Sequence, residues 1–515
     1  MSTATAPDQG LDRKLLAVAG VVVLGAVMSI LDTTIVNVAI DTLGRDLHAS
    51  LGTIQWVSTG YMLALATVIP ITGWAAERFG TKRLFMLAVT LFVAGSALCG
   101  LSWSSESLIA FRVLQGLGGG MVMPVGMMIL AQAAGPQRMG RVMSVIGVPM
   151  LIAPVIGPAL GGYLIDEISW RWIFFVNIPV GAVALLLAWR ILDRDAPHER
   201  HAFDLRGFLL LSPGLTALVY GLAEAGSVGS LTAVKPLAAI GLGLVLIAGF
   251  VWSAFHTERP LLDLNLFRVR AFWASSATTF LLGGALFGAM ILMPLYYQLV
   301  HGASALDAGL LLAPQGLGAA TAMPIAGRLS DRIGPGRIVL AGLVVVLAGT
   351  FAFTQVTATT SFVVLSVALY FRGVGLGMTM MPAMSAAYQV LDRAAVPRAT
   401  TTLNILNRVG GALGTAILAV LLQSHIQDAL IGLVPAGSTG SAAADPGALP
   451  TAAREALAPA LAGAFADTFW WAMALTALAL LPAMLLPMGP PAAPVEVDRR
   501  EVGADAPEPV LAAVD

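Results

Sequence analysis

One carboxylate and one guanidinium fall inside long apolar runs of the sequence, where a charged side chain is costly. Asp32 lies in the run from Leu15 to Ile40, and Arg112 lies in the run from Leu108 to Ala134. A charge at the centre of a membrane helix costs about 2.5–3.5 kcal/mol on insertion scales, and such residues commonly mark proton or substrate pathways. Burial disfavours the charged form of a carboxylic acid. We therefore expect Asp32 to take up and release a proton, with Arg112 as its partner.

Three arginines lie within apolar runs: Arg112, Arg372 and Arg408. Arg112 has a purely structural alternative, in which its guanidinium snorkels or pairs with backbone carbonyl groups. For Arg372 and Arg408 we expect the structural role.

Two charged loops repeat each other at an offset of 254 positions. Glycine in such loops permits a tight turn and close helix approach, while the acid and the arginines can pair with neighbouring helix ends. Pairs of this kind, broken and remade as helices move, would form a latch; the simpler alternative is a positively charged loop with a turn. The residues are Gly73, Glu77, Arg78, Gly80 and Arg83 in the first copy, and Gly327, Asp331, Arg332 and Gly334 in the second.

A third motif combines proline and glycine within the apolar run from Met139 to Ile165: Pro154, Gly157, Pro158, Gly161 and Gly162. Proline weakens a helix, and small residues let membrane helices approach closely. We expect this face to seal an internal cavity against proton leakage, with ordinary close packing as the alternative.

Candidates for a substrate cavity are polar, aromatic and methionine side chains within the apolar runs. Aromatic rings can hold a cation, and methionine adapts to varied ligands. Ordinary core or lipid-facing positions are the alternative for each. The candidates are Asn37, Gln55, Tyr61, Gln115, Met123, Phe287, Tyr296, Gln298, Gln315, Met381, Asn404 and Asn407.

The composition of the chain excludes several functional classes. Of 515 residues 57% are hydrophobic and 11% are charged, against about 25% charged in a soluble protein. The net charge of −1 gives no basic field for nucleic acid, and the single Cys99 excludes an internal disulfide or a cysteine metal cage. No catalytic triad or Gly-Lys phosphate loop is evident. We expect neither an enzyme nor a bound cofactor or metal.

The apolar runs predict an all-α polytopic membrane protein with about fourteen spans. We expect a six-helix bundle in residues 15–192, two additional membrane helices in 205–256, and a second six-helix bundle in 271–488. Segment 1–14 and a disordered tail, 489–515, should be cytoplasmic, because 21 of the 28 Lys and Arg residues fall on that side and only four on the other. Residues 424–464 should form an external loop, with a short helix around Thr451–Leu457.

These motifs together resemble the major facilitator superfamily, and within it the fourteen-span drug:proton antiporters of the EmrB/QacA type. The resemblance extends from about Leu15 to Met488. Besides the charged loops, it is carried by Leu31-Asp32-x-Thr34-x-x-Asn37-x-Ala39, Arg112-x-x-Gln115-Gly116-x-Gly118, Pro154-x-x-Gly157-Pro158-x-x-Gly161-Gly162, Trp170-Arg171-Trp172-x-Phe174-x-x-Asn177-x-Pro179 and Met293-Pro294-Leu295-Tyr296-Tyr297-Gln298.

The resemblance implies a monomer in the bacterial cytoplasmic membrane that exports small lipophilic, cationic drugs or dyes in exchange for protons. Alternating access between two bundles would be driven by the proton gradient, without a cofactor. Because no acid lies deep in the later spans, coupling at several sites is not expected. Export of a self-made metabolite, siderophore or lipid precursor is one alternative, and a non-transporting membrane sensor is another.

Overall fold

The structure, a computed structural model, describes residues 12–135, 138–195, 202–391, 395–430 and 451–490. Within these residues every regular element is a helix, and thirteen helices are long and apolar enough to cross a membrane. The expected span at residues 139–165 is not among the thirteen, but it coincides with α7, a helix of 29 residues from Met139 to Glu167. The prediction of an all-helical polytopic membrane protein is confirmed.

The first half of the molecule begins with the longest apolar run. The Asp12 side chain starts α1 by accepting a hydrogen bond from the backbone N–H of Leu15, which lowers the pKa of Asp12. Ser104 and Ser107 cap the start of α6 reciprocally. The helices are α1 (Arg13–Asp46), α2 (Leu51–Ile54), α3 (Trp56–Val68), η1 (Ile69–Ile71), α4 (Thr72–Phe79), α5 (Thr81–Gly100), α6 (Ser105–Ala134), α7 (Met139–Glu167), α8 (Trp172–Phe175) and α9 (Asn177–Ile191).

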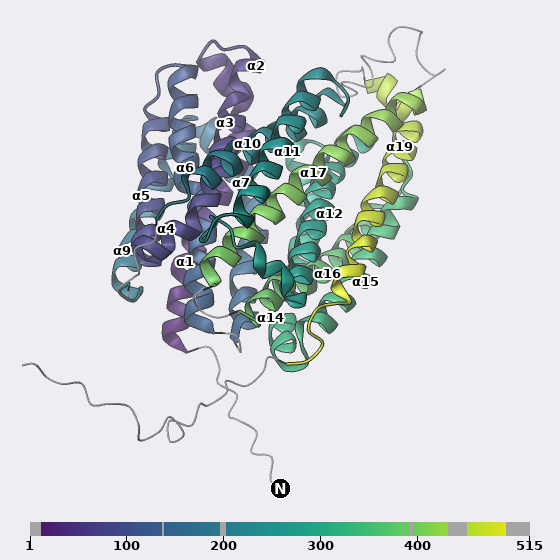
Figure 1. Cartoon of the computed structure of the whole chain (residues 1–515). Coiled ribbons are helices and arrows are strands. Elements are labelled where there is room, and N and C mark those ends of the chain that lie inside the picture. Colours follow the sequence, from purple (N-terminus) through teal and green to yellow (C-terminus); the bar gives the residue numbers. More distant parts are fainter. Residues whose placement is uncertain (1–11, 136–137, 196–201, 392–394, 431–450, 491–515) are drawn as a thin grey trace, which may run out of the picture.

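The second half repeats this order of long helices. It consists of α12 (Arg270–His301), α13 (Ala305–Leu311), α14 (Ala313–Ile333), α15 (Pro335–Phe351), η4 (Ala352–Gln355), α16 (Phe362–Tyr388), α17 (Val396–Leu430), α19 (Thr451–Leu478) and α20 (Leu480–Ala483). The short η3 (Leu264–Arg268) precedes it. Figure 1 shows the two halves side by side, with α1, α5 and α9 on one flank and α15 and α19 on the other.

The segment from 424 to 464 differs from the loop predicted for it. α17 continues to Leu430, and α19 starts at Thr451 and runs unbroken to Leu478, so the expected short helix at Thr451–Leu457 is the beginning of this long one. Residues 451–464 contain many alanines and leucines, which have a high helix propensity in water as well as in lipid. Hydropathy measures membrane preference and not helix propensity, so it did not predict this helical extension. Residues 431–450, most of segment 1–14 and nearly all of the expected tail lie outside the described residues.

The two additional helices, α10 (Leu205–Val228) and α11 (Val234–Phe255), form a hairpin between the halves. α10 contacts α3 of the first half and α17 of the second. The Thr67 and Thr216 hydroxyls are 2.7 Å apart, and the rings of Trp56 and Tyr220 stack. α11 instead presents exposed apolar side chains such as Val245, which suits contact with lipid. The hairpin therefore bridges both halves through α10.

Glycines bring the long helices of each half into close contact. In the first half, a Cβ at Gly157 of α7 would collide with Thr34 of α1, and one at Gly161 would lie 3.0 Å from the Ile35 side chain. In the second half, Gly414 of α17 packs directly against Gly284 of α12 in the same way. These small residues allow backbones to meet where a larger side chain would separate them.

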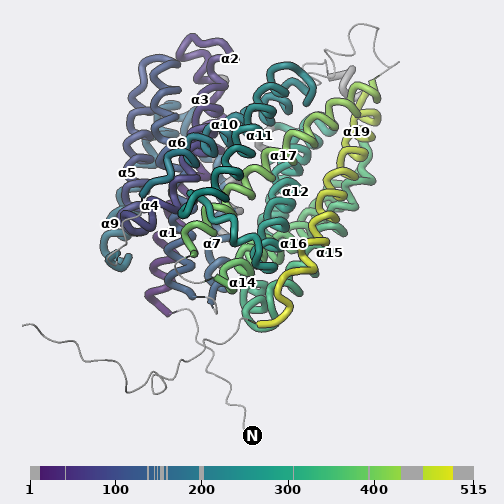
Figure 2. Tube along the Cα trace, in the orientation of Figure 1, coloured from purple at the N-terminus to yellow at the C-terminus, as the bar shows by residue number. Residues whose placement is uncertain are grey.

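The halves meet along two seams. On one side α7 packs against α14 and α16; on the other, α17 packs against α4 and α6, and α10 lies alongside (Figure 2). We call the end of the bundle at which α1 begins the basic face, because most of the arginines and lysines among the described residues lie there. In Figure 1 this face is at the lower edge, and α2 lies at the upper edge, on the opposite face.

Candidate functional site

The carboxylate of Asp32 lies at the centre of a closed polar network inside the first half. Arg112 Nη1 donates to Asp32 Oδ2 at 2.5 Å, Gln115 Nε2 donates to Oδ1 at 2.7 Å, and Asn177 Nδ2 donates to Oδ1 at 3.1 Å. The side chain of Asp32 is 0% exposed and that of Arg112 is 1% exposed. Helices α1, α6 and α9 thus place one charge pair and two amides in contact.

The guanidinium of Arg112 is held on further sides. Its Nε donates to the backbone carbonyl of Val57 at 3.2 Å, and its Nη1 also donates to Gln115 Oε1 at 2.8 Å. The ring of Tyr61 covers the guanidinium at 4.0 Å, within the range of a cation–π interaction. The contact with Asp32 and the contact with a backbone carbonyl, considered as alternatives for Arg112, occur together.

A second layer of polar groups fixes the amide that reaches Asp32. Asn177 Nδ2 also lies 2.9 Å from Ser96 Oγ, which in turn donates to the carbonyl of Phe174. Asn177 belongs to one of the sequence motifs but was not predicted as a residue of the site. In the sequence Asn177 is a single amide at the start of an apolar run, and that pattern alone does not show that Asp32 is its hydrogen-bond partner.

Asp32 is closed off from solvent in this conformation. Tyr61 and Arg112 cover it, and the Tyr61 hydroxyl is within 3.2 Å of Ser29 Oγ. A cleft of about 320 Å³ between α3 and α6 is lined by Trp56, Gly60, Leu63, Ala64, Thr67, Ile109, Val113 and Leu117, and does not include Asp32. Proton exchange with water therefore requires a different arrangement of these side chains.

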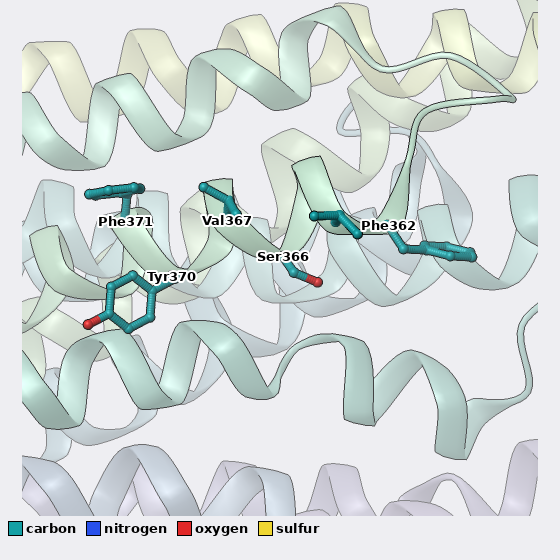
Figure 3. A pocket seen from close by; sticks show the side chains of 6 residues that line it. Phe362, Ser366, Val367, Tyr370 and Phe371 are labelled. Atoms are coloured by element: carbon teal, nitrogen blue, oxygen red, sulfur yellow. The ribbon is translucent and has the colours of Figure 1, made fainter.

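A second cleft, of about 470 Å³, lies on one face of α16 and is formed by Phe362, Val363, Ser366, Val367, Tyr370 and Phe371. Figure 3 shows these side chains along a single helix, with Tyr370 directed toward a neighbouring one; its hydroxyl lies 3.2 Å from that of Thr321 on α14. Because the lining is mostly apolar and one-sided, this cleft offers surface for lipid or a lipophilic molecule but no carboxylate or basic side chain.

Arg372 is the counterpart of Arg112 in the second half. Its Nη1 donates to Gln315 Oε1 and approaches Met293 Sδ at 3.9 Å, while its Nε has no hydrogen-bond partner. Arg372 is 2% exposed. No carboxylate among the described residues contacts it, so this charge is buried without an ionic partner.

The first charged loop joins the two halves at the basic face. Arg398 of α17 donates from Nε and Nη2 to the two oxygens of Glu77, both at 2.9 Å. Nearby, the hydroxyls of Thr72 and Thr401 are 3.0 Å apart, and a Cβ at Gly73 would lie 3.0 Å from Thr401 Oγ1. We call this set the first latch. Arg398, separated by 321 positions from Glu77, was not expected from the sequence.

The repeated loop joins the halves on the other seam by a different contact. Asp331 Oδ1 accepts from the backbone N–H of Gly140 at 3.0 Å, and Oδ2 accepts from that of Arg141 at 3.2 Å. Asp331 thereby caps the N-terminus of α7, where the helix dipole favours an anion. A side chain at Gly140 would contact the carbonyl of Gly327, so α7 and α14 approach closely here. We call this set the second latch.

The remaining loop residues shape the turns. Gly80 and Gly334 have φ of 89° and 96°, which side-chain-bearing residues rarely adopt. The backbone N–H groups of Lys82 and Arg83 donate to Asp195, which caps α5. Arg78 lies over the rings of Trp74 and Phe79, while Arg83 and Arg332 are exposed.

The third motif lies only partly within the described side chains. Gly157 and Gly161 pack on α1 beside the helix turn that carries Asp32, and Gly162 faces open space. The side chains of Pro154 and Pro158 are outside the described part of the chain.

None of the substrate-cavity candidates lines either of these two clefts. Tyr61 and Gln115 belong to the Asp32 network, Gln315 to the Arg372 site, and Tyr296 to the core of the second half, where its hydroxyl donates to the Thr357 carbonyl. The other candidates are dispersed. The spacing of residues along a sequence does not give the rotation of each helix about its axis, so it does not show which side chains face one another. Gln55 is exposed at the opposite face, Met123 and Gln298 are half-buried, Phe287 packs near Gly411, Met381 packs near Gly147, Asn404 and Asn407 donate to the carbonyls of Thr400 and Thr279, and the Asn37 side chain is not described.

Comparison with known proteins identifies relatives of this chain in sequence and in fold. Residues 22–415 match the Major Facilitator Superfamily. A multidrug resistance protein B homolog of Mycobacterium tuberculosis is 45% identical over 93% of this chain and 91% of its own length. A tetracenomycin C resistance and export protein of Streptomyces glaucescens is 32% identical over 80% and 76%. Among solved structures, the proton:xylose symporter XylE aligns with a TM-score of 0.58 at 13% identity, over 92% and 95% of the two chains.

Proposed function

The chain belongs to the major facilitator superfamily of membrane transporters, and we propose that it exports lipophilic small molecules in exchange for protons by alternating access. The observation that carries this proposal is the buried Asp32–Arg112 pair with its two amide donors. It is supported by relatives named for multidrug resistance and for tetracenomycin C resistance and export. The latter also supports export of a self-made metabolite as the second candidate.

Protonation of Asp32 is the proposed switch. A neutral carboxylic acid no longer attracts the guanidinium, and Arg112 is then held mainly by the Val57 carbonyl, Gln115 and the Tyr61 ring. Because Asp32 and the face that packs on Gly157 and Gly161 belong to one helix, a change in the pair alters the packing of α1 on α7. This links the proton to the position of a helix that contacts the second half.

The latches support an assignment of the conformation. Lys and Arg are concentrated at the basic face, so we place that face in the cytoplasm of a bacterial cell and the termini with it. Both latches close the halves together there. The described state is then closed to the cytoplasm, and transport requires both latches to open.

The decisive experiment separates proton coupling from a structural role for the pair. D32N is expected to abolish proton-coupled export in reconstituted vesicles, but it also leaves Arg112 unpaired in the interior, which destabilises a protein. The double variant D32N/R112Q removes both charges and avoids that cost. If Asp32 carries the proton, the double variant folds and still does not move protons when substrate is added.

A purely structural pair gives the opposite result. Recovery of substrate-driven proton flux in D32N/R112Q, with D32N alone inactive and unstable, would refute the proposal. Thermal unfolding and monodispersity of each purified variant provide the control for folding.

A further inference from the structure

We propose that the transport pathway favours substrates with a negative charge, and that Arg408 is the group that binds this charge. The inference rests on the proposed function in naming a substrate class for the same pathway. It reverses the preference for cations expected from the aromatic and methionine candidates.

Arg408 lies on α17 between the two halves of the molecule. It is twelve residues from the start of this helix at Val396, or about 18 Å along its axis. Along its length α17 packs on α6 and α10. The Arg408 side chain is exposed. Thr401, seven positions earlier and therefore on the same face of α17, has its hydroxyl 3.0 Å from that of Thr72 in the first half. Since charged side chains deep in membrane proteins face the interior or a water-filled space rather than lipid, Arg408 points into the space between the halves.

Arg408 has no anionic partner. It makes no hydrogen bond or ion pair with any described residue, in contrast with Arg112 and Arg398, which each contact a carboxylate. Arg372 adds a second buried cation without a carboxylate. The Asp32–Arg112 pair is neutral overall, so the interior that remains carries an excess of positive charge.

Among the described side chains, the carboxylates of the helices that meet between the halves do not balance this excess. Those of α6, α7, α10, α14 and α17 lie at or near helix ends: Glu106, Asp166, Glu167, Glu224, Asp331 and Asp428. Asp467 is exposed on α19, whose neighbours are α12, α15 and α17 of the second half. In a medium of low dielectric constant a cation approaching Arg408 is repelled and an anion is attracted.

An apolar cleft lies on α6, one of the helices that α17 packs against. The cleft between α3 and α6 is lined by Gly60 and Ala64 on either side of Tyr61 in sequence, and by Leu117. Its volume of about 320 Å³ suits the body of a small lipophilic molecule. An aromatic or aliphatic body in the cleft with a carboxylate or sulfonate directed at Arg408 is the ligand chemistry that fits.

The test compares two probes that differ only in charge: dansyl amides with the same alkyl linker, one ending in a carboxylate and the other in a trimethylammonium group. Binding is measured by dansyl fluorescence with the purified full-length protein in lipid nanodiscs. We expect the carboxylate probe to bind about tenfold tighter. R408Q should remove this preference without weakening binding of the trimethylammonium probe, and R372Q should reduce it less.

Two variants control for charge and folding. R408K keeps the positive charge and should keep most of the preference, and R45Q removes an exposed arginine at the opposite face and should change nothing. Tighter binding of the trimethylammonium probe, or an equal response of R408Q and R45Q, would overturn the inference. Because binding is measured without transport, the preference for the carboxylate probe should persist in D32N/R112Q. Restored proton flux in that variant would refute only the proposed coupling.

Discussion

Arg112 and Arg372 occupy corresponding helices of two similar halves, yet their surroundings differ. Arg112 on α6 meets the carboxylate of Asp32 on α1 at 2.5 Å, whereas Arg372 on α16 meets the thioether of Met293 on α12 at 3.9 Å. Each arginine also contacts an earlier helix of its own half: Arg112 contacts α3 through the Val57 carbonyl, and Arg372 contacts α14 through the Gln315 amide. The same scaffold therefore holds a neutral pair on one side and an isolated cation on the other.

This difference assigns different tasks to the halves. Within the described spans, only the first half brings an acid into contact with its buried arginine, so a change of protonation can make or break an interaction there. The second half has a fixed charge whose effect is electrostatic. We interpret the first half as the proton-responsive part and the second as the part that sets the charge preference for substrate.

The strongest test of this comparison removes each arginine in turn. R112M leaves the Asp32 carboxylate buried without its cation, and breaking a buried pair in this way typically costs about 3–5 kcal/mol. R372M removes a cation that has no carboxylate, so the free energy of unfolding should stay the same or rise. Thermal or denaturant unfolding of the purified variants measures the difference. Equal destabilisation by both changes would show that the two sites are equivalent.

The latches provide a second comparison between the halves. E77Q weakens two charge-assisted hydrogen bonds to Arg398, and D331N weakens two bonds to the start of α7; each bond to a charged group contributes about 1.5–3 kcal/mol. We expect both variants to open the basic face. Disulfide formation between cysteines introduced by T72C and T401C reports closure, because those hydroxyls are 3.0 Å apart.

The disulfide yield should fall severalfold in E77Q and less in D331N, since the reporter lies in the first latch. E106Q, at the opposite face, serves as the matched control and should leave the yield unchanged. An undiminished yield in E77Q would mean that the first latch does not hold the halves together.

The smallest expected effect comes from making the second half resemble the first. M293D places a carboxylate beside Arg372 and should add a second exchangeable proton, while M293L preserves the apolar contact as a control. Each additional proton adds about 1.36 kcal/mol per pH unit to the driving force, or tenfold in the substrate gradient. Proton flux per substrate measures this ratio. If it remains the same as in M293L, the carboxylate does not titrate in this position and the two sites differ by more than one side chain.

Much of the architecture could be predicted from the sequence. Apolar runs gave the helices, because a backbone in lipid must satisfy its hydrogen bonds within the helix and covers the bilayer with about 20 residues. The repeat at an offset of 254 gave the two charged loops, since each loop is a short local pattern. A lone acid and a lone arginine within apolar runs indicated a buried pair, because each alone would be costly there.

The partners of these residues were decided by tertiary structure. Asn177 reaches Asp32 across 145 positions, Arg398 reaches Glu77 across 321, and Arg141 meets Asp331 across 190. Close packing sets the rotation and tilt of each helix, and these decide which side faces the neighbouring helix. At Gly157, for example, the missing side chain leaves room for Thr34. Hydropathy predicts how deep in the membrane a residue lies, but it does not predict the direction in which the side chain points around the helix axis. For that reason the sequence determined that Asp32 and Arg112 are buried, while only the packed helices determined that the pair is closed and that Arg408 has no carboxylate partner.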